Sequence, residues 1–590
     1  MGFEHGSLPL AGRRFLILLA LLGSAFFPAF AGPRKIAKDL KDVDPSRPVE
    51  VIVRFQQAPT ANLHNKVLSR GGTLNRELRL IRSAAYTLPG SAIEGLAADP
   101  AVEYIAPNRA LHSTRSNPGN WANDYHIDSV GAQAAWAQGL DGSGVGVAII
   151  DSGIGDSPDL VKDRIVFSYD FVNHHAGAAN DQYGHGTHVA GIIAGSGKSS
   201  LGTDYSYKFL GIAGGVNLLN LRVLDENGAG TDGDVIAAIQ KAIALKDKYN
   251  IRVINLSLGR DVFESYALDP LCLAAEEAWK AGIVVVVAAG NEGRDNSAGN
   301  EGYGTITAPG NDPYVITVGA MNTRGARSPY AVIPASYSSK GPSAIDHVVK
   351  PDLVAPGNLV ISLYNPGFTL NRVSPSNEIA RSLYSNHSDA TPSNAYFVLS
   401  GTSMAAPMVS ATAALMLQQD ATLTPDQVKA RLMKTAFKDL VPYSFASDPQ
   451  TGQTFFLEAD VFTVGAGYLD IEAALANSDR MRPVIGGAMS PLAGVDGSGN
   501  VILFVSGASA MWGTSAMWGT SAMWGTRRIS TSAMWGTSAM WGTRTLGTSA
   551  MWGTSLLAGD GAVWGRQPVH PAGTAIPALS ALSAGALQDK

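Results

Sequence analysis

Cysteine, strongly charged stretches and long apolar runs are scarce in this chain. Its 590 residues include one cysteine, so no intramolecular disulfide can hold the fold. Charged residues make up 16%, the formal net charge is −5, and no basic stripe interleaved with aromatic residues occurs, which argues against nucleic acid as a partner. After the N-terminal segment, no apolar run reaches the length of a membrane span. Apolar residues nevertheless make up 45%, and the length predicts two or more domains with hydrophobic cores.

The N-terminal segment, residues 1–31, has the pattern of an export signal. Arg13 and Arg14 precede an apolar run at 15–27, and residues 29–31 fit the small-x-small rule of signal peptidase. The run is short for a membrane span, so we expect cleavage and secretion, with an uncleaved anchor as the alternative. The single cysteine, Cys272, lies in an apolar stretch typical of a helix, and we expect it to be a buried core residue.

Residues 32–116 and 117–480 differ in their patterns. The first segment predicts a small α+β module, with a strand at 49–55, a helix at 61–68, a strand near 83–88, and a helix and strand within 92–105. The second has nearly continuous apolar runs at 145–150, 218–223, 252–256 and 283–288, with helix-length stretches at 234–249 and 274–281 between them. Such runs are typical of parallel strands buried on both faces, so this segment predicts an α/β fold.

Residues 481–590 form a low-complexity tail. Ser-Ala-Met-Trp-Gly-Thr occurs six times, beginning at positions 509, 515, 521, 532, 538 and 549, and seven of the ten Trp residues lie in this tail. We favour low-complexity sequence with little fixed structure. Three alternatives stay open: Trp side chains that contact the cell envelope, a stacked repeat with every Trp on one strand face, and a processed sorting tail.

Two polar motifs follow the first strand of the second segment. Asp151 comes directly after the strand at 145–150, at the carboxyl end where functional groups gather in parallel sheets, although a turn or helix cap would also explain it. His185 stands between two glycines at the start of a predicted helix, with His188 one turn later. The two histidines could share a metal ion, but no HExxH pattern or acidic cluster accompanies them. We therefore expect His188 to be a hydrogen-bonded core or supporting histidine.

Two further motifs flank strands and helices later in the chain. Ser403 precedes the small-residue helix at 408–417, where it is either an N-cap or a nucleophile beside free N–H groups. Ala405 occupies the place of the second glycine of a GxSxG elbow, which excludes that motif. Asn291 follows the strand at 283–288; alone it indicates a turn, but facing Ser403 its amide would stabilise a negative oxygen.

Taken together, these motifs resemble the subtilisin-like serine protease family over roughly 121–475, with supporting matches at 253–259 and 350–357. The resemblance implies a three-layer α/β/α domain with a mostly parallel sheet, and a secreted serine endopeptidase that works through an acyl-enzyme. Ser403 would be the nucleophile, His185 the general base and Asp151 the carboxylate that orients the base. Asn291 and the Ser403 N–H would form the oxyanion hole.

The resemblance also implies how substrates are bound. The segments that would line the primary pocket and pair with the substrate backbone are Ser257, Leu258 and Gly259 on one side and Ala288, Ala289 and Gly290 on the other. Protein or peptide substrates are the implied partners. The 32–116 segment would be an inhibitory propeptide, cut between about 110 and 121, so that the enzyme is a self-processing zymogen. A non-catalytic surface module that acts through the tail is the rival hypothesis.

The chain departs from the family pattern in two places. Asp159 matches a calcium carboxylate of the family, but the partner loop at 197–208 is longer and Tyr-rich here. Calcium at Asp159 is therefore a hypothesis, and no cofactor is implied for the chemistry. A second insertion, at 364–394, is polar and is predicted to be a surface loop.

Overall fold

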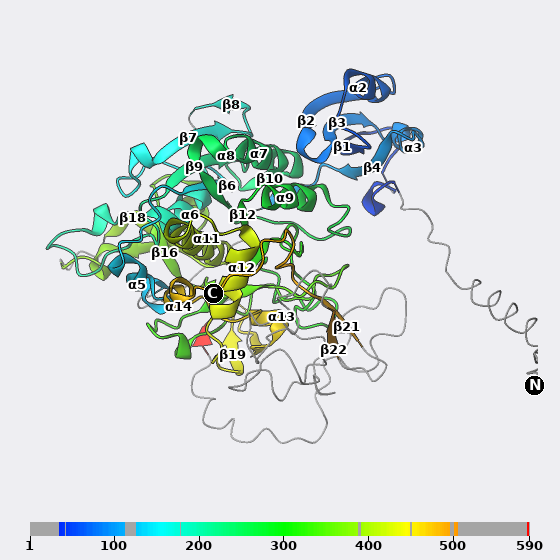
Figure 1. Cartoon of the computed structure of the whole chain (residues 1–590). Helices are drawn as coiled ribbons and strands as arrows, with labels where there is room; N and C mark the ends of the chain where they lie inside the picture. The colour runs from blue at the N-terminus through cyan, green and yellow to red at the C-terminus, as the bar shows by residue number, and fades with distance from the viewer. Residues whose placement is uncertain are drawn as a thin grey trace, which may run out of the picture.

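The structure is a computed structural model that describes residues 35–41, 43–112, 126–177, 179–386, 391–448, 451–495, 501–504 and 587–588. The predicted export signal and the Trp repeats lie outside the described residues. Figure 1 shows a small N-terminal unit, in blue, beside a larger unit that contains most of the chain. Among the described residues, no helix has both the length and the apolar character needed to cross a bilayer.

A four-stranded antiparallel sheet forms the small unit, in the order β2-β3-β1-β4, and two helices pack against one of its faces. Its elements are β1 (Pro48–Phe55), α2 (Ala61–Leu68), β2 (Thr73–Leu78), β3 (Ser83–Pro89), α3 (Ile93–Ala97) and β4 (Val102–Pro107). Along β1, Val51, Val53 and Phe55 join the core under the helices, whereas Ile52 joins the core of the larger unit. The predicted strand at 49–55 is confirmed, and both of its faces are buried.

The larger unit is built on a nine-stranded, mostly parallel sheet in the order β14-β13-β12-β11-β6-β9-β7-β8, with β15 also paired to β13. Only the two outermost strands, β14 and β8, run antiparallel to their neighbours. The strands are β6 (Gly146–Asp151), β7 (Ile165–Asp170), β8 (His175–Ala176), β9 (Asn217–Arg222), β11 (Ile251–Leu256), β12 (Val284–Ala288), β13 (Ile316–Asn322), β14 (Ile333–Pro334) and β15 (Leu353–Pro356). The four apolar runs of the sequence are buried parallel strands, as predicted, and the structure places them next to one another in the sheet.

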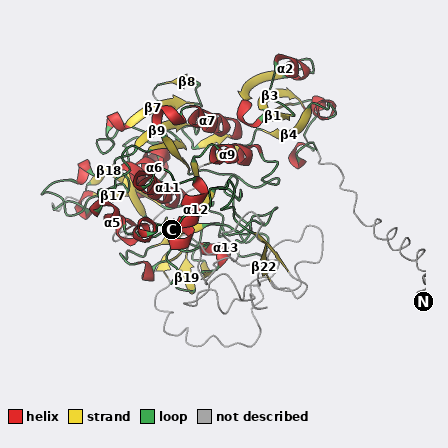
Figure 2. Cartoon of the chain, viewed as in Figure 1, coloured by secondary structure: helices red, strands yellow, loops and turns green. Residues whose placement is uncertain are grey.

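Helices cover both faces of this sheet (Figure 2). On one face α6 (His185–Ala194) packs against α11 (Thr402–Gln419), and on the other α7 (Asp232–Ala244) packs against α9 (Pro270–Lys280). The predicted α/β/α layers are confirmed, and Cys272 is a buried, free thiol in α9. The remaining helices are α4 (His126–Ser129), α5 (Ala132–Ala137), α8 (Lys246–Tyr249), α10 (Thr369–Val373), α12 (Pro425–Thr435), α13 (Val461–Val464) and α14 (Ile471–Ala476).

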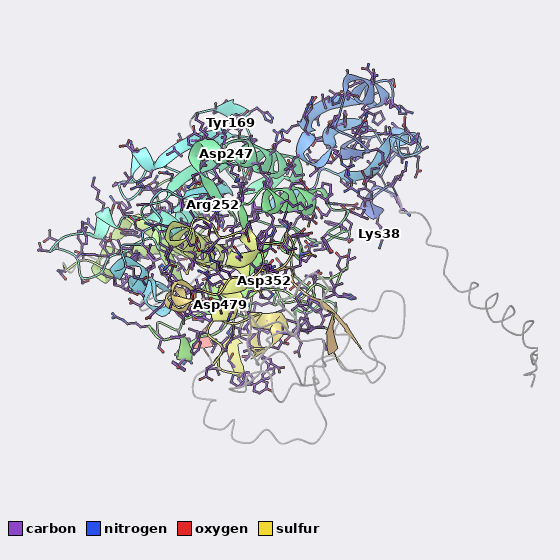
Figure 3. All side chains as sticks on the ribbon, viewed as in Figure 1. Lys38, Tyr169, Asp247, Arg252, Asp352 and Asp479 are labelled. Atoms are coloured by element: carbon purple, nitrogen blue, oxygen red, sulfur yellow. The ribbon has the colours of Figure 1, made fainter. Side chains whose placement is uncertain are left out.

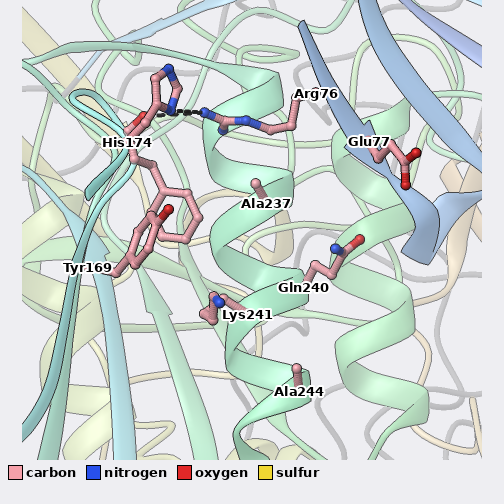
Figure 4. Close-up of a pocket in the computed structure, with 9 residues that line it drawn as sticks. Arg76, Glu77, Tyr169, His174, Ala237, Gln240, Lys241 and Ala244 are labelled. Atoms are coloured by element: carbon pink, nitrogen blue, oxygen red, sulfur yellow. Dashed lines mark hydrogen bonds between the residues drawn. The ribbon is translucent and has the colours of Figure 1, made fainter. Parts of the chain in front are cut away.

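The small unit contacts the larger one through charged groups beside α7. The Arg76 guanidinium pairs with Asp234 at 2.7 Å and donates to Nδ1 of His174 at 2.7 Å (Figure 4). The Leu80 N–H donates to the Gln240 side chain on the same helix at 3.1 Å. The interface is therefore specified by paired polar groups as well as by shared apolar side chains.

A second set of contacts joins the end of the small unit to the larger one. Arg109 donates to Glu264 at 2.8 Å, and Tyr104 donates to the same carboxylate. Directly afterwards, β5 (Ala110–His112) pairs antiparallel with β10 (Ala229–Thr231) of the larger unit. The chain thus leaves the small unit as a strand attached to the larger one.

The 364–394 insertion is not the surface loop that its polar composition predicts. It contains α10 and β17 (Glu378–Ala380), and it buries Phe368, Leu370, Ile379 and Tyr384. The Tyr384 ring stacks on Tyr205 of the other insertion, with centroids 5.8 Å apart and planes 4° from parallel. The expectation was wrong because a few apolar side chains, spread among many polar ones, supply the contacts between the two insertions.

Residues beyond 480 also pack on the larger unit. The Ser490 hydroxyl donates to the buried Asp352 carboxylate at 2.5 Å, beside the Lys350 ammonium at 2.7 Å from it. Figure 3 labels Asp352 within the larger unit. The remaining strands of the described residues are β16 (Val360–Leu363), β18 (Pro392–Leu399), β19 (Tyr443–Ser447), β20 (Thr454–Glu458), β21 (Leu492–Val495), β22 (Val501–Phe504) and β23 (Leu587–Gln588).

Candidate active site

A buried carboxylate and an imidazole meet at the carboxyl end of the central strand. Asp151 is the last residue of β6, and His185 is the first residue of α6. Asp151 Oδ1 lies 2.7 Å from His185 Nδ1, and both side chains are almost fully buried. Because a carboxylate accepts, Nδ1 carries the proton and Nε2 is left as the basic nitrogen. Among the described residues, Nε2 has no hydrogen-bond partner.

Asp181, which the sequence motifs did not single out, holds this pair in place. Its Oδ1 accepts from Ser152 Oγ at 2.9 Å, Tyr183 N at 3.0 Å and Gly184 N at 2.7 Å. Its Oδ2 accepts from the N–H and the hydroxyl of Thr187, at 2.9 and 2.6 Å. One carboxylate thus joins the residue after Asp151 to the first turn around His185.

Burial raises the pKa of Asp181 above its usual value, although the hydrogen bonds from Thr187 and Gly184 oppose that rise. In the sequence, the only signal for the role of Asp181 is its position four residues before the Gly-flanked His185, in a loop with no apolar pattern of its own. That signal does not distinguish an ordinary loop aspartate from one that organises a site, because its donors are mostly backbone N–H groups.

Ser403 lies in the first turn of α11, fully buried, after Gly401. Its hydroxyl donates to the Ser257 carbonyl at 3.0 Å, and the Ser257 hydroxyl donates to the Ser403 carbonyl at 2.9 Å. In this structure the Ser403 hydroxyl is therefore hydrogen-bonded to Ser257 and not to His185. Catalytic hydrogen bonds are often long or misaligned without substrate, and rotation about one side-chain bond redirects a serine hydroxyl.

Asn291 follows β12 and faces the same helix N-terminus. Its Oδ1 accepts from the Thr402 N–H at 2.9 Å and the Thr402 hydroxyl at 3.0 Å. These donors orient the amide, since an amide oxygen accepts and an amide nitrogen donates. The buried Nδ2 has no hydrogen-bond partner among the described residues. The Asn291 amide nitrogen is therefore an available donor, on a side chain held by Thr402, the residue before Ser403.

The two predicted pocket walls lie on adjacent parallel strands. Residues 257–259 follow β11, and residues 288–290 end β12 and continue past it. Thr307 stands between them: a Cβ added to Gly259 would lie 2.5 Å from its Oγ1, and one added to Gly290 would lie 2.7 Å from its Cγ2. The Thr307 side chain therefore fills the space that these two glycines leave.

The strand β5 runs along the first wall. His112 forms an antiparallel bridge with Gly259, and Leu111 is fully buried. On its other side β5 pairs with β10, with His112 opposite Ala229. A stretch of the chain's own backbone is thus held between two segments of the larger unit in the manner of an added strand.

The surroundings of Asp159 do not fit a calcium ion. The side chain is fully buried, its Oδ1 accepts from the Ser199 N–H at 2.6 Å, and its Oδ2 accepts from the Tyr396 hydroxyl at 2.5 Å. Calcium takes about six to eight oxygen ligands. Within the described residues no group of three or more His, Cys, Asp or Glu side chains could hold a metal ion. Donors of the 197–208 insertion and β18 satisfy this carboxylate instead.

His188 is a core histidine, as expected. Its Nε2 donates to the Phe397 carbonyl at 3.1 Å, and the residue is fully buried. Burial, and secondarily the proximity of His185, lower the pKa of His188 to about 3, so its ring is neutral near pH 7.

Comparisons with known proteins agree with this arrangement. The model of the subtilase family, Peptidase S8, matches residues 142–467. Serine protease AprX from Bacillus subtilis is 40% identical over 300 residues, which are 50% of this chain and 62% of that protein. Subtilisin E from Bacillus subtilis is 33% identical over 391 residues, which are 65% of this chain and 84% of that protein.

A solved structure shows the same fold. The crystal structure of fervidolysin from Fervidobacterium pennivorans, described as a keratinolytic enzyme related to subtilisin, superimposes with a TM-score of 0.54. It is 23% identical in sequence, and the match covers 75% of this chain and 62% of fervidolysin. Because the family model matches more than half of the sequence, this chain belongs to the subtilase family of serine peptidases.

Proposed function

We propose that the chain is a serine endopeptidase that cleaves peptide bonds through an acyl-enzyme. In this mechanism Ser403 Oγ attacks the scissile carbonyl, and His185 Nε2 takes its proton and later delivers it to the leaving amine. Asp151 keeps the proton on Nδ1 and stabilises the imidazolium. The observation that carries the proposal is the 2.7 Å contact between Asp151 and His185, which leaves Nε2 as the basic nitrogen. The chemistry uses protein groups alone.

The oxyanion hole of the proposal consists of the Asn291 amide and the Ser403 N–H. Because Thr402 fixes the Asn291 oxygen, the amide does not have to reorient when negative charge develops on the substrate. The N-terminus of α11 adds the positive end of a helix dipole at the same place. Both features favour the tetrahedral intermediate over the bound substrate.

The proposed primary pocket lies between Ser257–Gly259 and Ala288–Gly290, with Thr307 limiting its depth. A side chain entering between the walls would meet the Thr307 methyl and hydroxyl groups, which are in contact with Gly259 and Gly290. We therefore infer a preference for small side chains before the scissile bond, in proteins or peptides that bind as an extended strand.

The zymogen part of the proposal rests on β5. A strand that is covalently attached to the small unit and pairs with Gly259 would compete with substrate for the same backbone groups. The ion pairs Arg76–Asp234 and Arg109–Glu264 would hold the small unit in place until it is cut. These contacts support an inhibitory propeptide.

The register of β5 narrows the expected cut. His112 pairs with Gly259, and the Ser403 hydroxyl contacts the carbonyl of Ser257, two residues earlier. Counting two residues past His112 in an antiparallel register reaches position 114. Positions 114 and 115 lie outside the described residues, so the count alone predicts the Thr114–Arg115 bond. The N-terminal residue of the mature enzyme, read by mass spectrometry, tests it.

Casein digestion by the wild type and by Ser403→Ala tests the catalytic proposal. We expect the wild type to digest casein and process itself, and the variant to do neither. Equal digestion by both proteins would defeat the proposal. His185→Ala, which leaves the serine in place, should behave like Ser403→Ala because both groups act in the same step.

Export completes the proposal, because the N-terminal signal pattern supports secretion. For the Trp repeats, contact with the cell envelope is the alternative to a tail with little fixed structure. Retention on isolated envelopes, compared with and without residues 509–565, tests envelope contact. Equal retention would remove it.

A further inference from the structure

The 364–394 insertion fastens itself to the residues just before His185. The Thr369 N–H donates to the Gln182 carbonyl at 3.0 Å, and the Leu370 N–H donates to the Tyr183 carbonyl at 3.0 Å. These carbonyls belong to the loop that leads into α6. The family pattern does not require the insertion, yet N–H groups of the insertion donate to the carbonyls of this loop.

Phe368 occupies the space beside the start of α6. A Cβ added to Gly184 would lie 2.7 Å from Phe368 Cδ2, and one added to Gly155 would lie 2.8 Å from Phe368 Cζ. The Phe368 side chain is 8% exposed, so contacts of this kind bury it almost completely. Gly184 has φ +108°, and it is the residue immediately before His185. The ring therefore rests directly on the backbone that carries the imidazole.

The loop on which Phe368 rests is also fixed by hydrogen bonds. Gly155 donates to the Thr187 hydroxyl at 2.8 Å, and Thr187 and Gly184 both donate to Asp181. The first turn of α6 is thus hydrogen-bonded to a carboxylate, and the residue before it packs against an aromatic ring. A helix start fixed in both ways has little freedom to shift.

We propose that Phe368 is a positioning residue that keeps His185 aligned with Asp151. This role rests on the proposed function, in which His185 is the general base. Phe368 touches no reacting atom in the proposal; it acts through Gly184. Because the insertion is a departure from the family pattern, the chain supports its base with a segment of its own.

The expected consequence follows from the 2.7 Å contact. Removing the ring leaves a cavity beside Gly184, so the first turn of α6 can move and the Asp151–His185 hydrogen bond lengthens. A weaker bond orients the ring less firmly and stabilises the imidazolium less. The titratable side chains that face the His185 ring are Asp151 on β6, Tyr183 in the preceding loop, with ring centroids 6.5 Å apart, and His188 one turn later.

The kinetic test compares Phe368→Ala with Phe368→Leu and with Val373→Ala, a change at a half-exposed position of the same insertion. We expect Phe368→Ala to lower kcat/KM by about tenfold to a hundredfold, mainly through kcat, and to move the acidic limb of its pH profile to lower pH. Phe368→Leu should restore most of the activity, and Val373→Ala should stay within about twofold of wild type. A Phe368→Ala enzyme that is less stable but keeps its kcat/KM and acidic limb overturns the proposal.

A second readout separates this proposal from the proposed function. Histidine labelled with ¹⁵N allows the His185 Nδ1–H group to be observed by NMR in the full chain carrying Ser403→Ala, which prevents self-digestion. A longer hydrogen bond to Asp151 moves this proton resonance upfield, so we expect the shift with Phe368→Ala and not with Phe368→Leu, whether or not the wild type digests casein. Identical resonances overturn the positioning role. A shifted resonance in a chain whose wild type is inactive supports positioning and refutes the peptidase proposal.

Discussion

Replacing Asp181 with asparagine changes one oxygen of a buried carboxylate into an NH₂ group. The carboxylate accepts three hydrogen bonds on Oδ1 and two on Oδ2. Asparagine has a single accepting oxygen, which can serve only one of the two sets. The orientation that loses the fewest hydrogen bonds places the asparagine oxygen where Oδ1 was. The N–H and hydroxyl of Thr187 then face an NH₂ group that cannot accept from them.

The magnitude follows from these two lost contacts. Hydrogen bonds to a charged acceptor contribute about 1.5–3 kcal/mol each, so the loss from Thr187 is about 3–6 kcal/mol. Part of it is offset, because burial raises the pKa of Asp181 and an amide carries no charge to desolvate. We therefore expect Asp181→Asn to lower the free energy of unfolding by about 3 kcal/mol. Displacement of the first turn of α6 should also lower kcat/KM by up to about a hundredfold.

Urea unfolding and peptidase assays of purified enzyme measure both effects. Asp163→Asn is the matched control, because Asp163 is exposed in a surface turn. Both of its values should equal those of the wild type. If Asp181→Asn unfolds and cleaves like Asp163→Asn, the five hydrogen bonds do not organise the site and the reasoning is refuted.

Three further predictions concern the loop around Asp159, the buried His188 and the proposed pocket. Tyr396→Phe should lower the free energy of unfolding by about 1–3 kcal/mol, because it leaves the buried Asp159 short of a donor. Wild-type thermal unfolding should be unchanged by EDTA or added calcium, and a midpoint that falls on chelation contradicts this. Because the pKa of His188 is about 3 in the folded chain and 6.5 in the unfolded chain, the unfolded chain binds more protons between these values. The free energy of unfolding of the wild type should therefore fall by about 1.4 kcal/mol per pH unit through this histidine as pH falls from 6.5 toward 3. Urea unfolding at pH 7 and 4.5 should show a smaller loss of stability for His188→Gln than for the wild type. Equal losses would contradict the burial argument. Thr307→Gly should raise cleavage after aromatic residues relative to alanine in a peptide library, and an unchanged profile would show that Thr307 does not limit the pocket.

The central strands could be predicted from the sequence because they are buried on both faces. The apolar runs at 145–150, 218–223, 252–256 and 283–288 match β6, β9, β11 and β12 to within one residue at each end. Burial on two faces leaves no polar alternation, so the whole strand carries the signal. The placement of Asp151 at a strand end followed from the same pattern, whereas the order of the strands in the sheet comes from the structure.

The supporting residues could not be predicted in this way. Asp181 acts through donors that are mostly backbone N–H groups, which every residue except proline has, so its partners have no sequence signature. Phe368 is a single aromatic residue in a polar insertion, and only the folded chain brings it against Gly184. Tyr396 satisfies Asp159 across 237 positions of the chain, a separation that no local motif spans.

The most direct test of the account is covalent labelling with a fluorophosphonate, which reacts with a serine only when that serine is activated. Peptide mapping by mass spectrometry then shows which residue carries the phosphonyl group. The account predicts one adduct, on Ser403, in the mature wild-type enzyme, and none in His185→Ala or Ser403→Ala. An adduct on a different serine, or labelling of Ser403 that persists at the same rate without His185, would contradict it.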